Sequence, residues 1–358
     1  MMTDLFRDHP ELGWGSFSYI HEKPPKPINS RPPVFLSEAL KKSPFYSMVS
    51  FFAGCGGLDA GFERNGFFPI AMVESDADSC QTYRINHPKT IVIGPPDSFG
   101  EISDIQGTCK GLSLAGVKAP YNGVFTAAPP NEYSALLFIQ YIRMCKPIAF
   151  FMVLNQETDK IRRELKTLNG MQYDRTSVSE YSDSYFGTPR KNSHYFVAGS
   201  RVGSVLHPFS DIRGTGFKSY EYAATARAKN DRKPIFCWKP LLEKIDGLSD
   251  MEIQDMRVMF FRDISQLKYG QKSGISEFYR VHPHREVELT EIPSCLHPFF
   301  PRKFTIREYA RVSGFPDEYQ FYGDYESKYR QIFKSISPLT AYYYAVRIRS
   351  RLDKPVRK

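Results

Sequence analysis

The feature that most constrains the fold is an apolar strand pattern that enters a glycine-rich turn and leaves it as a helix. A buried strand is predicted at 48–53, the turn F-A-G-C-G-G-L occupies 52–58, and a helix follows from about Leu58 to Asn65. A second apolar run, from Phe68 to Glu74, completes a strand–helix–strand unit. Such units place parallel strands side by side and bury them under helices. The pattern therefore favours an α/β protein.

Later segments extend this plan. Apolar strands are predicted at 123–127 and 148–154, and between them the stretch from Tyr133 to Cys145 has its apolar residues on one helical face. The expected fold is α/β, a doubly wound, Rossmann-like sheet with a second, smaller irregular domain.

Composition divides the chain into four parts. Residues 1–44 are rich in proline and charge and are predicted to form an extended arm. The main domain is expected at 45–204, completed by 301–350, where a helix begins near Thr305. Between them, 205–300 shows weak periodicity and is predicted to be the smaller domain, and 351–358 form a basic tail.

Charge and composition restrict the environment and the partners. The formal net charge is +9, which favours an anionic partner such as nucleic acid. The chain has no apolar run of the length that an export signal or a membrane span needs, so we expect an intracellular protein, cytoplasmic or nuclear, without a membrane. Six cysteines form no C-x-x-C pair, which predicts reduced thiols. The spacing of His282, His284, Cys295 and His297 fits no standard zinc module, so no metal is expected.

The glycine turn is the first candidate site. Glycines let the backbone approach a ligand, and a helix N-terminus offers free N–H groups to a carboxylate. About twenty residues further on, Glu74 is placed to accept hydrogen bonds from a ribose diol, and Gly100-Glu101-Ile102 offers another acid at the next strand end. Tight structural turns show the same glycine pattern, so the turn alone does not identify a ligand.

The order of motifs resembles the cytosine-5 DNA methyltransferase family from about Ser47 to Val346. The matching segments are F-A-G-C-G-G-L, Val73-Glu74, G-E-I, P-P-N-E-Y-S in place of P-P-C-Q-G-x-S, Lys146-Pro147, F-G-T-P-R-K-N-S-H-Y-F-V-A-G, F-T-I-R-E-Y-A-R-V-S-G-F-P and Y-R-Q-I-F-K-S-I-S-P-L. The resemblance implies a methyltransferase-like domain at 45–204 with 301–350, and a target-recognition-like domain at 205–300. It also implies an S-adenosylmethionine site formed by Phe52, Gly54, Gly56, Gly57, Leu58, Glu74, Glu101 and Ile102.

Three positions depart from the pattern that the resemblance implies for catalysis. Asn131 stands where the family has the cysteine that adds to the flipped cytosine, and an amide offers no thiolate. Val153 stands in place of the glutamate of E-N-V, and His194 in place of the last arginine of Q-x-R-x-R. The resemblance therefore predicts a degenerate member without catalytic residues of its own.

Other residues leave alternatives open. Glu132, Cys145 and Cys55 are candidates for a relocated reactive group, although Cys145 is expected at a helix end and Cys55 in the turn. Phe333 and Lys334 replace two residues of the family's I-G-N-S-V. They are predicted to narrow the cofactor pocket, to pair with an anionic ligand, or simply to pack against the sheet and the solvent.

The main hypothesis is a catalytically inactive homologue that acts as a regulatory or accessory subunit of a DNA methyltransferase or DNA-binding complex. The expected partners are double-stranded DNA and a heteromeric partner such as an active methyltransferase. The candidate DNA-binding residues are basic and lie in one interval: Arg213, Lys218, Arg227, Lys229, Arg232 and Lys233. The alternatives are an active methyltransferase with atypical residues or cofactor, and a stand-alone DNA-binding or cofactor-sensing module.

Overall fold

The structure is a computed structural model, and it describes residues 46–95, 105–186, 188, 190–202, 279–280, 289, 295–296, 304, 306–316 and 318–353. The predicted arm at 1–44 and most of the predicted smaller domain at 205–300 lie outside these residues. Within 205–300, two short strands, β8 (Tyr279–Arg280) and β9 (Cys295–Leu296), pair in parallel.

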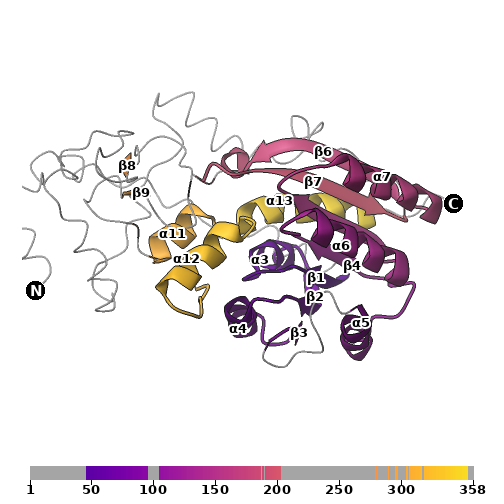
Figure 1. The fold of residues 1–358 in the computed structure, drawn as a ribbon, viewed down its shortest axis with the longest axis horizontal. Coiled ribbons are helices and arrows are strands. Elements are labelled where there is room, and N and C mark those ends of the chain that lie inside the picture. The colour runs from indigo at the N-terminus through magenta and orange to yellow at the C-terminus, as the bar shows by residue number, and fades with distance from the viewer. Residues whose placement is uncertain are drawn as a thin grey trace, which may run out of the picture.

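A seven-stranded sheet forms the centre of the described part, in the order β3-β2-β1-β4-β5-β7-β6 (Figure 1). The first five strands are parallel: β1 (Tyr46–Phe51), β2 (Phe67–Val73), β3 (Ile91–Ile93), β4 (Val124–Ala127) and β5 (Ala149–Leu154). The strand β7 (Ser193–Ser200) runs antiparallel to β5 and to the edge strand β6 (Asp174–Ser182). The predicted doubly wound α/β fold is confirmed.

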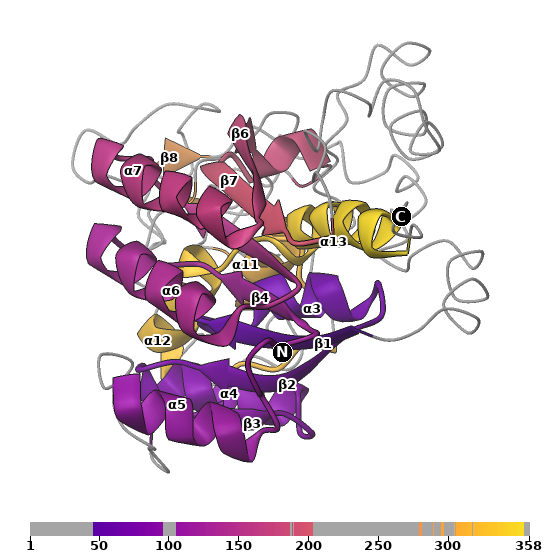
Figure 2. The ribbon, with the colours of Figure 1, turned by 90° about the vertical axis from the view of Figure 1, so that its right-hand side faces the viewer.

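Helices cover both faces of the sheet because the strands bury side chains on both sides. Val49 and Phe51 of β1 point into the core beneath α5 (Ile105–Leu114), α6 (Glu132–Cys145) and α7 (Asp159–Thr167). Met48 points to the opposite face, where α3 (Gly57–Glu63) and α13 (Pro338–Leu352) pack. Figure 2 shows α6 and α7 on one side of the sheet and α3 and α13 on the other.

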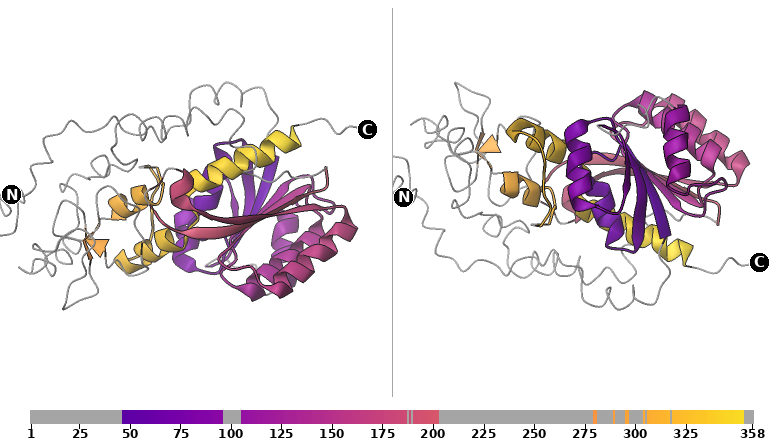
Figure 3. Two further views of the ribbon diagram at one scale, coloured as in Figure 1. Left: turned by 90° about the horizontal axis from the view of Figure 1, so that it is seen from above. Right: turned by 90° about the horizontal axis from the view of Figure 1, so that it is seen from below.

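The C-terminal helices return to the glycine turn. Helices α11 (Ile306–Val312) and α12 (Tyr325–Lys334) share a buried cluster with Cys55 of the turn and Ala60 of α3. Figure 3 shows α11 and α12 beside one end of the sheet, while α13 runs along its face. Helix α13 extends to Leu352 and so includes the first two residues of the predicted basic tail at 351–358.

One further helix and two short turns of 3₁₀-helix complete the described elements. Helix α4 (Ala77–Asn86) connects β2 to β3, and its N-terminal turn is capped by the side chain of Asp76, which accepts a hydrogen bond from Ser79 N. The 3₁₀ turns, η4 (Leu168–Met171) and η5 (Asp183–Phe186), flank β6.

Candidate functional site

The glycine turn lies at the carboxyl end of β1 and needs unusual backbone geometry. Gly54 and Gly56 have φ angles of 55° and 91°, in the left-handed region that glycine enters without steric cost. Phe52 has a φ of 51° although it carries a side chain. A non-glycine residue in this region is strained, and its surroundings must hold it there. Part of that support is the hydrogen bond from Phe52 N to Val73 O, 2.8 Å long.

Glu74 fastens the turn to the end of β2. One carboxylate oxygen, Oε2, accepts a hydrogen bond from Gly54 N at 2.8 Å. The other, Oε1, accepts from Ser75 N at 2.7 Å and from Asp76 N at 3.0 Å. Each carboxylate oxygen offers about two acceptor positions. Oε2 therefore keeps capacity for one further donor, such as the hydroxyl group of a ribose.

The turn has one open side, and Gly54 forms it. A Cβ added at Gly54 meets nothing within 4 Å. By contrast, a Cβ at Gly57 falls 2.0 Å from Ser335 Oγ, and the Leu58 side chain is buried in the core. The predicted cofactor residues thus divide into a pair at the open side of the turn, Gly54 and Glu74, and residues that pack against protein. Glu101 and Ile102, predicted for the same site, lie outside the described residues.

Phe333 and Lys334 come at the end of α12, where they were predicted to narrow the pocket, to pair with an anionic ligand or to pack. The Phe333 ring packs, partly buried, against the cluster that α11 and α12 form with the turn. Lys334 is exposed. Both placements agree with the packing alternative.

Asn131 has a structural task at the start of α6. Four residues, 128–131, connect the end of β4 to the first residue of α6. Asn131 is the N-cap residue, and its side-chain oxygen accepts a hydrogen bond from Ser134 N at 2.9 Å. Asparagine is among the residues best suited to cap a helix, because its side chain satisfies an N–H group that the helix leaves unpaired.

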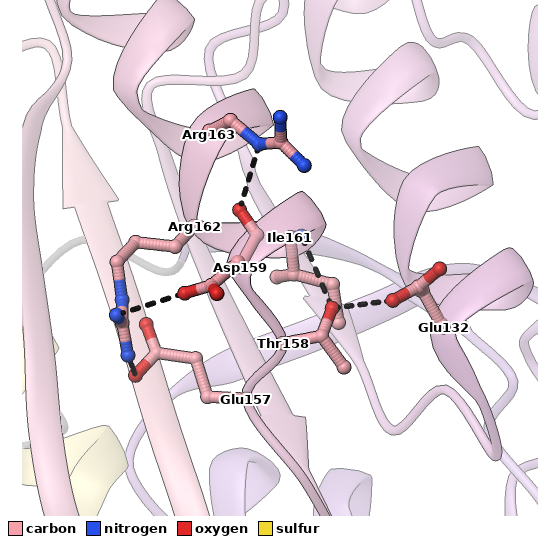
Figure 4. Close-up of polar contacts among 7 residues, drawn as sticks. All are labelled: Glu132, Glu157, Thr158, Asp159, Ile161, Arg162 and Arg163. Carbon is pink, nitrogen blue, oxygen red and sulfur yellow. Dashed lines mark hydrogen bonds and ion pairs between the residues drawn. The ribbon is translucent and has the colours of Figure 1, made fainter.

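Glu132 is engaged in contacts between two helix N-termini (Figure 4). Its Oε2 accepts a hydrogen bond from the hydroxyl of Thr158, the N-cap residue of α7, at 2.5 Å, and Oε1 lies 3.8 Å from Lys160 Nζ. Sequence reasoning missed Thr158, although a threonine before an acidic first turn is a capping signal. These contacts tie Glu132 to α7 and count against a role as a relocated reactive group.

The neighbouring charges in Figure 4 pair with one another. The guanidinium of Arg162 lies between Glu157, at 3.4 Å, and Asp159, at 3.2 Å. Arg163 Nε donates a hydrogen bond to the carbonyl of Asp159.

Val153 and His194 lie inside the sheet. The Val153 side chain is 2% exposed and belongs to the core, and Val153 pairs with Phe196 of β7. His194 on β7 is 3% exposed, and its ring packs edge-on against Phe196. At these two positions the side chains contribute to packing between β5, β7 and the helix face.

Arg190, four residues before His194, is a buried residue whose contacts the sequence did not predict. It is 1% exposed, and its Nε lies 3.5 Å from the buried carboxylate of Asp183. The guanidinium also donates to the carbonyls of Ser335, at 2.9 Å, and of Phe333 and Ile332 at the end of α12. The planar guanidinium holds its N–H donors in a fixed arrangement, which suits simultaneous contacts with a carboxylate and several carbonyls. Arg190 therefore joins the segment between η5 and β7 to the end of α12.

The cysteine side chains that the structure describes are poor nucleophiles. Burial raises the pKa of Cys55 and of Cys80 to about 12 and that of Cys145 to about 11, so these thiols stay protonated near neutral pH. Cys145 ends the 14-residue helix α6, which Asn131 caps at its other end. At 1.5 Å per residue, about 20 Å separates it from Asn131.

The remaining predictions fall largely outside the described residues. The six predicted DNA-binding residues, from Arg213 to Lys233, lie in 203–278, as does the Cys237 thiol, and the side chains of His282, His284, Cys295 and His297 are also not described. In the described part of the chain, no group of His, Cys, Asp or Glu could hold a metal ion. No helix among the described elements has the length and apolar character to cross a bilayer.

Comparison with known proteins decides the family. The profile of the C-5 cytosine-specific DNA methylases matches residues 46–130 and 158–350. The chain belongs to this family. The match omits 131–157, the segment that contains two of the three altered positions, Asn131 and Val153.

Individual members agree with this assignment. The chain is 26% identical to the type II methyltransferase M.DdeI of Desulfomicrobium norvegicum, over 84% of this chain and 88% of that protein. It is also 26% identical to M.NgoPII of Neisseria gonorrhoeae, over 86% and 96%. Among solved structures, the S. pombe Dnmt2 methyltransferase superimposes with a TM-score of 0.60 at 14% identity, over 86% of this chain and all of that one.

Proposed function

We propose that this chain is a catalytically inactive member of the C-5 cytosine DNA methylase family that acts as a regulatory or accessory subunit in a DNA-binding complex, alongside an active methyltransferase. The observation that carries the proposal is the position of Asn131. An amide that caps α6 stands after the two prolines, where the family resemblance places a cysteine.

The buried positions support the same proposal. The side chains of Val153 and His194 pack within the sheet, at the two positions where the resemblance implies an acid and an arginine. A general acid or base is typically worth about 10²–10⁴ in rate, and loss of the covalent route adds to this. Glu132, the acid nearest to Asn131 in sequence, is held by Thr158 and Lys160.

The cofactor turn supports retained binding of S-adenosylmethionine. Gly54 leaves open space, and Glu74 keeps acceptor capacity beside it. When bound there, S-adenosylmethionine supplies a methyl group on a sulfonium. In this chain, Glu74 Oε2 would accept from one ribose hydroxyl and the turn would hold the amino-acid end. A protein that keeps this turn without a nucleophile can respond to the cofactor and pass the response to a partner.

A methyl-transfer assay tests the inactivity. We expect no transfer from labelled S-adenosylmethionine to cytosine in DNA by the wild-type protein, with an active C-5 cytosine DNA methylase as positive control. N131C alone should not restore transfer, because Val153 and His194 remain. Robust transfer by the wild type would refute the proposal. Rescue by N131C would show that Val153 and His194 are compatible with catalysis.

Co-purification tests the accessory role. A tagged chain isolated from its native host should bring down a methyltransferase with an intact P-P-C motif, and adding the chain to that enzyme should change its rate of methylation. Isolation of the chain alone under mild salt would favour the stand-alone module instead.

A further inference from the structure

The centre of the glycine turn, Cys55, is bonded to a segment from the C-terminal part of the chain. The hydroxyl of Tyr319 donates a hydrogen bond to the Cys55 carbonyl oxygen at 2.5 Å, and the Cys55 thiol donates to the carbonyl of Gln331 at 3.5 Å. Tyr319 lies between α11 and α12, and Gln331 lies in α12. The segment 319–331 therefore contacts the turn at both of its ends.

The bond from the Tyr319 hydroxyl fixes the orientation of one peptide group. The carbonyl of Cys55 and the N–H of Gly56 belong to the same planar trans peptide and point in opposite directions. Gly56 N donates to the carbonyl of Ala53 at 3.0 Å, which closes a four-residue turn at 53–56. The glycines on both sides of Cys55 leave the backbone free to adopt other forms, so a contact from outside the turn is needed to select this one.

The same segment is also bonded to helix α4. The side chain of Asn86 donates to the Gln320 carbonyl at 2.7 Å and accepts from Gln320 N at 3.0 Å. One helical turn earlier, Thr82 Oγ1 accepts from Tyr322 N at 2.8 Å and donates to Gln331 Oε1 at 2.6 Å. These bonds fix α4 against the segment 319–331.

The two sets of bonds reach the two halves of the candidate site. Cys55 follows Gly54, at the end of β1. Helix α4 begins just after Glu74, at the end of β2, and its N-cap residue Asp76 donates its backbone N–H to Glu74 Oε1 at 3.0 Å. Because the segment 319–331 is bonded to both halves, it sets the spacing between them.

Tyr319 is itself held in place. Arg307 Nη2 of α11 donates to the Tyr319 carbonyl at 2.8 Å, and the Tyr319 ring packs against the rings of Phe315 and Phe321, with centroids 5.0 and 5.5 Å away. His87 Nε2 lies 3.1 Å from the hydroxyl. Burial raises the pKa of the Tyr319 hydroxyl well above its usual value, so the group keeps its proton and stays a donor.

We propose that Tyr319 is a positioning residue for S-adenosylmethionine binding at the glycine turn. Its hydroxyl does not touch the ligand but acts through the Cys55 carbonyl, and so keeps the Gly54 N–H and the Glu74 carboxylate in the arrangement that binds. A site that is ordered before the ligand arrives binds more tightly, because less ordering remains to be done on binding. This role rests on the proposed cofactor site and identifies a residue that sets its affinity.

Calorimetric titration of the full chain with S-adenosylmethionine tests the role. Y319F keeps the ring and removes the hydroxyl, and it should bind about threefold to tenfold more weakly, which is the loss expected for one hydrogen bond. Y329F is the matched control. Tyr329 is a buried tyrosine of the same cluster, but its hydroxyl donates to the Phe304 carbonyl and not to the turn. Y329F should bind like the wild type.

Hydrogen exchange without ligand gives a second measurement, which a general loss of stability would not reproduce. In Y319F, the amides of Gly54 and Gly56 should exchange faster than in the wild type and in Y329F. The amides of β4, in the middle of the sheet, serve as the internal reference and should exchange at the same rate in all three proteins.

The outcomes separate the role of Tyr319 from the cofactor site on which it rests. A wild-type protein that does not bind S-adenosylmethionine would overturn both. Wild-type affinity in Y319F, or equal losses in Y319F and Y329F, would overturn the role of Tyr319 and leave the cofactor site standing. If Y319F does not fold, N86A removes the two bonds to Gln320 instead. Weaker binding by N86A would then support the proposal, and wild-type affinity would overturn it.

Discussion

An asparagine and a cysteine offer different chemistry at the first turn of a helix. The Asn131 side chain accepts a hydrogen bond from Ser134 N, whereas a thiol is a weak acceptor and caps a helix poorly. A change from cysteine to asparagine therefore removes a nucleophile and strengthens the helix start in one step. The reverse change, N131C, loses the capping hydrogen bond to Ser134 N and therefore weakens the start of α6.

Glu74 provides the sharpest residue-scale test of the cofactor binding that we propose for the glycine turn. We expect E74A to lower the affinity for S-adenosylmethionine by about 10- to 100-fold, because hydrogen bonds to a charged group are worth about 1.5–3 kcal/mol. Isothermal titration calorimetry measures this directly. E132A, at the start of α6, is the matched control and should leave the affinity unchanged. Equal affinities of E74A and the wild type would place the cofactor elsewhere.

Asp59 predicts a pH dependence of stability. Its pKa is raised by burial to about 6 in the folded protein, so the folded state binds its proton more tightly than the unfolded state. The free energy of unfolding should therefore fall as the pH rises from about 4 to about 6. Relative to the wild type, D59N should gain up to about 3 kcal/mol over this range.

Urea denaturation of both proteins at several pH values checks this prediction. D159N alters an exposed carboxylate and serves as control. A D59N curve parallel to that of the wild type would mean that Asp59 is ionised throughout the range.

At the scale of elements, the sequence predicted what local patterns encode. The strand–turn–helix–strand unit and α6 were found within one or two residues of their observed ends, because apolar periodicity and glycines mark them. The short edge strand β3 was missed. The packing roles of Gly56 and Gly57 were also missed, since they depend on Tyr319 and Ser335, more than 250 residues away in sequence.

Arg190 contacts both Asp183 and the end of α12, which are far apart in sequence, and we predict the effect of replacing it. R190M should destabilise the protein by about 3–5 kcal/mol, because it leaves the buried carboxylate of Asp183 without its cation and the end of α12 without donors. R190K should recover little, since an ammonium lacks the planar fork. Chemical denaturation measures all three proteins.

The double variant R190M/D183N is the control for the buried Asp183 carboxylate that R190M leaves without a cation. It should be more stable than R190M, because the uncompensated carboxylate is gone, and Thr340, which donates to Asp183, can still bond to an amide oxygen. Equal stability of R190M and the wild type would show that the ion pair contributes nothing.

At the scale of the whole molecule, the described part supplies a sheet, a glycine turn and helices that pack against it, and these were largely predictable from the sequence. At the positions where the family resemblance implies catalytic residues, the chain has side chains that pack or cap a helix. The sequence shows that these residues differ from the family pattern, but their contacts become visible only in the fold. The formal charge of +9 belongs to the complete chain, and much of its basic character lies at 213–239 and in the C-terminal tail. DNA binding therefore has to be tested on the full-length protein.

The last prediction concerns that binding. DNA affinity should fall steeply with salt, and the logarithm of the affinity should change by about −0.9 per phosphate contact for each unit of log salt. Reversing the charge of Arg227, Lys229, Arg232 and Lys233 together should flatten this slope by several units if these residues contact phosphates.

The matched control reverses Arg347, Arg351, Lys354 and Arg357 at the C-terminus. Fluorescence anisotropy with a labelled duplex at several salt concentrations gives the slope for each protein. A slope that changes only in the control would move the phosphate contacts to α13 and the tail. Strong preference for one short duplex sequence would contradict a binding mode based on phosphates alone.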